Sequence, residues 1–222
     1  MYVSAADWNL MENPPARGRG GRGPAGPPTQ IPRHDAEIKD GEPIVLGDFS
    51  VTPVAVPGHT PGSMGFVFPV QDNGRRHMAA LFGGAWLTPQ ILSDEALQTF
   101  LMSVLKFKEA TKRARVDVVL QNHMLMDPIQ PKLDAIAARK PRDANPFIVG
   151  PSDYQRFLGV MEGCTRVNLA RRMTGTRGSG GAPAAAPAAQ GQGRQSGQFA
   201  GLRVRKTAST NIAVVHGPEL TP

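Results

Sequence analysis

Two of the five histidines stand in short segments that could present an imidazole at the end of a β-strand. His59 lies within Gly-His-Thr-Pro-Gly-Ser at 58–63, and His123 follows the apolar run at 116–120 in Gln-Asn-His. Neutral imidazole is a common metal ligand, and glycines near His59 allow backbone angles closed to other residues. Both histidines are therefore candidate ligands, with a packed or solvated side chain as the alternative for each.

The elements expected around these histidines alternate between strands and helices. Turn signals such as Asp40-Gly41, Gly47-Asp48 and Asn73-Gly74 separate short apolar runs, which is typical of antiparallel strands. We predict a strand end with a short helix over 1–13, strands over 43–46, 49–56, 64–70, 77–82 and 116–120, and helices over 93–113, 131–140 and 152–172. This order places both histidines on turns at strand ends.

Side-chain spacing predicts which faces of the two long helices are buried. The apolar face of the helix over 93–113, capped by Ser93, is predicted to consist of Leu97, Leu101, Val104, Leu105 and Lys108. The buried stripe of the helix over 152–172 is predicted to consist of Tyr154, Phe157, Leu158, Met161 and Val167. Cys164 is expected to be a small buried residue, and Pro53 to place its strand at an edge or beside a bulge.

The net charge of +7 belongs to the C-terminal region. Residues 163–222 contain eight Lys or Arg and one Glu, whereas residues 1–162 contain 17 basic and 17 acidic side chains. The segment 174–200 has no apolar period, and 16–28 is rich in Arg, Gly and Pro. We therefore predict one domain over 1–172, interrupted by a flexible loop at 16–28, followed by a mostly disordered tail over 173–222.

The sequence at 58–63 resembles the third conserved motif of the metallo-β-lactamase superfamily, whose histidine binds zinc. The segment 33–48 resembles the strand pair before that motif, and 120–127 and 145–158 resemble the ending of third-subclass β-lactamases. The resemblance covers 3–172. It implies an α/β fold, the C-terminal portion of an αβ/βα sandwich. In the intact parent, two zinc ions would activate a bridging water, with His59 completing the first zinc site and His123 the second.

The family's other zinc ligands come from a His-x-His-x-Asp-His motif that is absent from this sequence. The remaining histidines are His34, His77 and His216, and no two of the five stand two residues apart. We expect His34 to be solvated and His77 to be exposed beside its hairpin turn. We also expect the chain to begin just after the missing motif and, with one protein ligand per zinc site, to be inactive alone. No catalytic side chain is assigned.

The segment Gly83-Gly84-Ala85-Trp86-Leu87 bears on the substrate. Glyoxalase-like and phosphodiesterase-like members carry a metal-bridging aspartate at about this place, so glycine favours the β-lactamase-like branch. Third-subclass members often offer serines here to the drug carboxylate, which Ala85 and Leu87 cannot do. The resemblance therefore implies hydrolysis of a cyclic amide such as a β-lactam, with the substrate-binding residues unassigned. Trp86 is expected in the core, with lining of the cleft as the alternative.

Two other classes of function stay open. An exposed sheet face could pair with a complementary chain that carries the missing motif, which would make this chain a non-catalytic interaction fragment. The Arg/Gly loop and basic tail could bind nucleic acid weakly, although they offer almost no aromatic side chain for base stacking. We expect a small-molecule substrate if the site is completed, and no membrane partner. The first residues lack the pattern of a secretory signal, and the compartment stays open.

Overall fold

The computed structural model describes residues 1–14, 31–85, 89, 92–124 and 126–174, and the backbone of two short strands at 203–205 and 214–216. The chain divides into two units, Met1–Thr174 and Gly175–Pro222. The loop predicted at 16–28, the side chains of Trp86 and Leu87, and most of the predicted tail lie outside the described residues.

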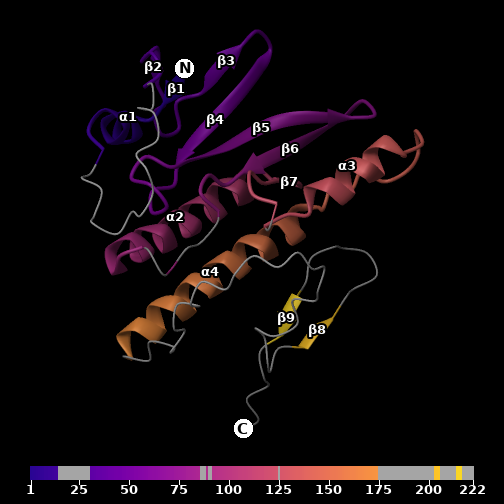
Figure 1. The fold of residues 1–222 in the computed structure, drawn as a ribbon. Helices are drawn as coiled ribbons and strands as arrows, with labels where there is room; N and C mark the ends of the chain where they lie inside the picture. Colours follow the sequence, from indigo (N-terminus) through magenta and orange to yellow (C-terminus); the bar gives the residue numbers. More distant parts are fainter. Residues whose placement is uncertain are drawn as a thin grey trace, which may run out of the picture. The chain divides into compact units, whose positions relative to one another are not determined.

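A five-stranded sheet forms the centre of the first unit (Figure 1). Its order is β3 (Ile44–Leu46), β4 (Phe49–Ala55), β5 (Met64–Asp72), β6 (Arg75–Leu81) and β7 (Val118–Leu120). The first four strands are antiparallel neighbours, and β7 runs parallel to β6. All five predicted strands are confirmed, with ends that differ by one or two residues. The predicted hairpin turns form at Gly47 and at Asn73-Gly74, where the residues adopt the positive φ angles that tight hairpins require.

The proline in β4 lies where it costs no sheet hydrogen bond. Strand β3 pairs with β4 only as far as Val51, so the missing N–H of Pro53 faces no strand on that side. The Pro53 carbonyl instead accepts a hydrogen bond of 2.8 Å from Gly41 N. Strand β4 lies between β3 and β5, so the prediction that Pro53 places its strand at the edge of the sheet is wrong, and the proline is accommodated where the pairing with β3 has ended.

Four helices complete the first unit: α1 (Ala5–Glu12), α2 (Asp94–Arg113), α3 (Ile129–Ala137) and α4 (Pro151–Met173). Ser4 and Ser93 cap α1 and α2 through their side-chain oxygens, as N-cap serines commonly do. Helix α3 begins two residues earlier and ends three residues earlier than the predicted 131–140. Two short strands, β1 (Tyr2–Val3) and β2 (Ala36–Glu37), form a separate parallel pair.

Helices α2 and α4 lie side by side on one face of the sheet (Figure 1). The core between them and the sheet includes Phe82, Phe100, Phe107, Tyr154 and Leu158, all at most 1% exposed. Within the described residues, no helix combines the length and the apolar character that crossing a membrane requires.

The predicted buried faces of these two helices were only partly right. The buried residues of α2 are Leu97, Phe100, Ser103, Val104, Phe107 and Thr111, and those of α4 are Asp153, Tyr154, Leu158, Met161 and Thr165. Leu101 and Leu105 are half-buried, Val167 is 49% exposed, and Cys164 is exposed rather than buried. Leu101, Leu105 and Cys164 each stand one position from a buried residue, which rotates them by about 100° around the helix from it.

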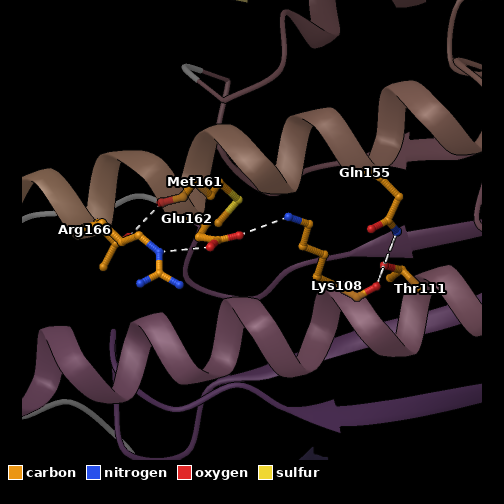
Figure 2. Close-up of polar contacts among 7 residues, drawn as sticks. Lys108, Thr111, Gln155, Met161, Glu162 and Arg166 are labelled. Atoms are coloured by element: carbon orange, nitrogen blue, oxygen red, sulfur yellow. Dashed lines mark hydrogen bonds and ion pairs between the residues drawn. The ribbon is translucent and has the colours of Figure 1, made fainter.

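Polar contacts join the two helices where an apolar face was predicted at Lys108 (Figure 2). Lys108 Nζ lies 3.0 Å from Glu162 Oε2, and Arg166 Nε donates to Glu162 Oε1 at 2.9 Å. One turn away, Gln155 Nε2 donates to Thr111 Oγ1 at 3.1 Å. Hydrogen bonds from Lys108 and then Arg166 lower the pKa of Glu162.

The second unit contains β8 (Arg203–Arg205) and β9 (Val214–His216), which pair antiparallel. Both strands lie in the region 173–222, for which the sequence predicted a mostly disordered tail.

Candidate functional site

The strand register brings both predicted ligands to the same end of the five-stranded sheet. Ala55 at the end of β4 pairs with Met64 at the start of β5, and Phe66 pairs with Leu81 at the end of β6. Leu81 in turn pairs with Leu120 at the end of β7. The turn with His59, the segment after β6 and the turn with His123 therefore all leave the sheet at one end (Figure 1).

The His59 side chain is exposed, and its turn rests against the segment after β6. Gly84 has a φ of 69°, and a Cβ at Gly84 would lie 2.5 Å from His59 Cβ and 3.0 Å from His59 Cγ. Such separations are far inside van der Waals contact, so only glycine lets this backbone pass behind the imidazole.

The preceding residues of the turn pack against α2. Gly58 has a φ of 135°, and a Cβ there would lie 2.6 Å from Phe100 Cα. Ser103 Oγ donates a hydrogen bond of 2.7 Å to the Pro57 carbonyl oxygen. Helix α2 therefore packs against the first residues of the turn, Pro57 and Gly58.

The following residues of the turn contact the N-terminal end of α1. Asp7 Oδ1 accepts from Gly62 N at 2.9 Å, and Asp7 Oδ2 accepts from Thr60 Oγ1 at 3.1 Å. Ser4 Oγ donates to the Gly62 carbonyl at 2.8 Å. The sequence gave no indication of these contacts from Ser4 and Asp7 to the turn, because their partners lie more than 50 positions away in the sequence.

His123 is half-buried in the turn that follows β7, and its carbonyl oxygen accepts from Met126 N at 3.0 Å. The end of this turn is anchored by Asp127, whose Oδ1 lies 2.6 Å from Lys132 Nζ with both side chains 6% exposed. Lys132 also lies over the Phe147 ring, 5.1 Å from its centroid. A buried ion pair of this kind fixes the connection between β7 and α3.

The other three histidines lie in different surroundings. His34 stacks on Trp8 with ring centroids 4.2 Å apart and stays partly solvated. His216 lies in β9, whose side chains are not described. The prediction that His77 is exposed is wrong: the ring is half-buried, and its Nδ1 lies 2.6 Å from Asp117 Oδ2 at the opposite end of β6. Asp117 stands 40 residues away, which local sequence does not reveal.

The described residues do not make a complete metal site by themselves. Among them, no group of three or more His, Cys, Asp or Glu side chains could hold a metal ion. A carboxylate after β6 is also excluded in the present backbone, because a Cβ on Gly83 would lie 1.9 Å from the Met64 carbonyl oxygen. A catalytic zinc ordinarily has three protein ligands, so His59 and His123 fit such a centre only as part of a larger donor set.

Comparisons with known proteins bear on the fold. No family model matches the sequence. A 50-residue stretch, 22% of this chain, is 44% identical to part of a hydroxyacylglutathione hydrolase of Hyphomonas neptunium, where it spans 20% of the protein.

Solved structures of β-lactamases match a much longer part of the chain. BJP-1, a subclass B3 metallo-β-lactamase of Bradyrhizobium japonicum, superposes with a TM-score of 0.58 at 20% identity over 79% of this chain and 65% of its own. A β-lactamase from Chitinophaga pinensis gives 0.54 at 22% identity over 77% and 63%. FEZ-1 from Legionella gormanii gives 0.52 at 21% identity over 63% and 53%.

This chain spans less than two-thirds of the length of each of these β-lactamases. The fold expected from the sequence is confirmed: the motif around His59, the strand order and the solved structures agree that this chain has the metallo-β-lactamase fold.

Proposed function

We propose that this chain supplies the His59 and His123 ligands of a zinc-dependent hydrolase that opens a cyclic amide of the β-lactam type. The observation that carries the proposal is the shared position of the two motif histidines at one end of the sheet. The names of the solved β-lactamases support the substrate class. Bound zinc would supply an activated water and polarise the scissile carbonyl.

The chain's own residues would hold the two imidazoles in place. Gly84 and the contacts from α1 and α2 restrict the backbone on both sides of His59. The Asp127–Lys132 pair anchors the turn that carries His123. Loss of a group that orients a metal ligand typically costs about 10- to 100-fold in metal affinity or activity.

We further propose that the chain does not hydrolyse substrate by itself. Its 222 residues include five histidines and no His-x-His-x-Asp-His segment. Because one imidazole in each site is too few to retain a catalytic zinc in water, the missing donors would have to come from another polypeptide segment.

A second candidate function is that of a non-catalytic fragment that complements a partner chain. Strand residues alternate between faces, and Val67 and Ala80 face the helices. Their neighbours Phe66, Phe68 and Leu81 therefore face the other side of the sheet, where Phe49 packs against Phe68 with ring centroids 6.1 Å apart. An apolar sheet face normally packs against another layer, which favours a polypeptide partner.

The test compares metal content and turnover of the purified chain with and without a second polypeptide carrying His-x-His-x-Asp-His. The chain alone is expected to retain less than one zinc ion and to leave nitrocefin intact. Zinc retention and hydrolysis that appear on mixing, and disappear with His59→Ala or His123→Ala, would support the hydrolase. Binding of the partner without zinc or turnover would favour the non-catalytic fragment. Two tightly held zinc ions with turnover by the chain alone would contradict the proposed inactivity.

A further inference from the structure

The side chain of Asp7 is fully engaged by the turn that carries His59, although the two segments are about 50 residues apart. One carboxylate oxygen accepts the Gly62 amide at 2.9 Å, and the other accepts the Thr60 hydroxyl at 3.1 Å. Helix α1 is only eight residues long, and its buried apolar side chain is Trp8. Its N-terminal end therefore contacts the turn mainly through polar groups.

The contact between α1 and the turn is too close for any other residue at position 62. A Cβ on Gly62 would lie 2.1 Å from Ser4 Oγ and 2.6 Å from Asp7 N. The backbone of the turn therefore lies directly against the first turn of α1, and the Asp7 carboxylate bridges two points of that backbone segment.

The same contacts determine where His59 points. Thr60 follows His59 directly, and the Thr60 carbonyl accepts from Gly58 N at 3.0 Å, which closes the backbone around His59. Thr60 N also donates to Ser63 Oγ at 3.0 Å. Asp7 holds Thr60 on one side and Gly84 packs against His59 Cβ on the other, so the backbone that sets the direction of the His59 Cα–Cβ bond is restricted on both sides.

We infer that Asp7 is the positioning residue of His59: its carboxylate aligns the turn so that the imidazole is presented to a metal ion. The inference rests on the proposed zinc function, and it assigns to α1 a role in ligand geometry. Asp7 itself is not proposed as a ligand, since each of its carboxylate oxygens already accepts a hydrogen bond from the turn. Losing the carboxylate should weaken zinc binding at His59 and leave the rest of the fold in place.

The variants separate this role from a general effect on folding. Asp7→Ala removes both contacts. Asp7→Asn keeps an oxygen for the Gly62 amide and presents an N–H to Thr60 Oγ1, whose hydroxyl can then donate to Ser63 Oγ, 2.8 Å away. Asp48→Ala, in the exposed turn between β3 and β4, makes the same chemical change at the other end of β4 from the His59 turn and serves as the matched control.

The experiment follows the full chain by NMR in the presence of the polypeptide that carries His-x-His-x-Asp-His, using the histidine ring signals during a Zn²⁺ titration and the hydrogen exchange of the Gly62 amide without metal. For Asp7→Ala, the Zn²⁺ concentration that half-shifts the His59 signal should rise about 5- to 30-fold, as expected for two lost hydrogen bonds. Gly62 exchange should accelerate, and the His77 signal should stay unchanged. Asp7→Asn should restore most of the wild-type response, and Asp48→Ala should match the wild type.

Wild-type exchange at Gly62 together with a wild-type His59 response in Asp7→Ala would overturn the inference. So would a change that affects His59, His77 and His123 equally, since that describes a general loss of structure. Should Asp7→Ala fail to fold, Thr60→Val removes one of the two Asp7 contacts and is expected to give the same selective loss, and a wild-type response there would contradict the inference. If no wild-type histidine responds to Zn²⁺ even when the complementing polypeptide is present, the proposed function fails, while Gly62 exchange still decides whether Asp7 holds the turn.

Discussion

Gly84 lies directly behind His59, with no room for even a methyl group between the two backbones. A Cβ at Gly84 would lie 2.5 Å from His59 Cβ, and the residue has a φ of 69°. The segment that follows β6 therefore packs directly against His59, the candidate ligand.

Replacing Gly84 with alanine should displace His59 and lower the free energy of unfolding by about 2–4 kcal/mol. Part of the loss, about 1–2 kcal/mol, comes from a left-handed backbone angle in a residue with a side chain. The remainder comes from the forced contact with His59. Urea denaturation gives the stability, and the His59 ring signal in NMR reports the displacement.

Gly74→Ala is the matched control for this prediction. Gly74 has nearly the same φ, 75°, but a Cβ there would have no heavy atom within 4 Å. Equal losses for the two variants, with the His59 signal unmoved in both, would show that Gly84 is required only for its backbone angle.

Acid should weaken the link between the β5–β6 hairpin and α3. The guanidinium of Arg139, followed by the amide of Asn145, lowers the pKa of Asp72 from 3.8 to about 2. Because the folded-state pKa lies below the unfolded one, the ionised carboxylate stabilises the fold fully above about pH 4, and this stabilisation is lost as the pH falls toward 2.

Asp72→Asn should remove that component of acid sensitivity. Its urea midpoint should be lower than that of the wild type at about pH 6, and the difference should shrink as the pH is lowered through the acid range. A difference that stays constant across this range would mean that the charge on Asp72 contributes nothing to the link.

The ion pair between α2 and α4 should contribute modestly to stability. Lys108→Met removes the partner of Glu162 in Figure 2 and should lower the free energy of unfolding by about 0.5–1.5 kcal/mol, since the pair is partly shielded from water. Lys112→Met, on the exposed side of the same helix, should change it by less than about 0.5 kcal/mol. Guanidinium denaturation of both variants gives the comparison, and a larger loss for Lys112→Met would contradict it.

Local signals in the sequence predicted most of the fold. Ser93 and the acids that follow it determine where α2 begins, and Asn73-Gly74 determines the β5–β6 hairpin, because caps and tight turns depend on a few adjacent residues. Family resemblance then supplied the fold, which the strand order and the solved structures confirm.

Contacts between distant segments were not predictable in the same way. Asp117 pairs with the His77 ring 40 residues away, and Asp7 accepts a hydrogen bond from the backbone amide of Gly62, 55 residues away. The buried side of α4 was partly misjudged at Val167 and Cys164, since a helix with weak apolar periodicity gives little indication of its orientation. The roles of His59 and His123 as ligands stay predictions.

The most direct test is anomalous diffraction at the zinc absorption edge from crystals of this chain combined with a polypeptide that carries His-x-His-x-Asp-His. The account predicts two zinc ions at the end of the sheet where β4, β6 and β7 finish, one bonded to the His59 ring and the other to the His123 ring. Zinc ions bonded to neither ring, or to a histidine elsewhere such as His77, would contradict it.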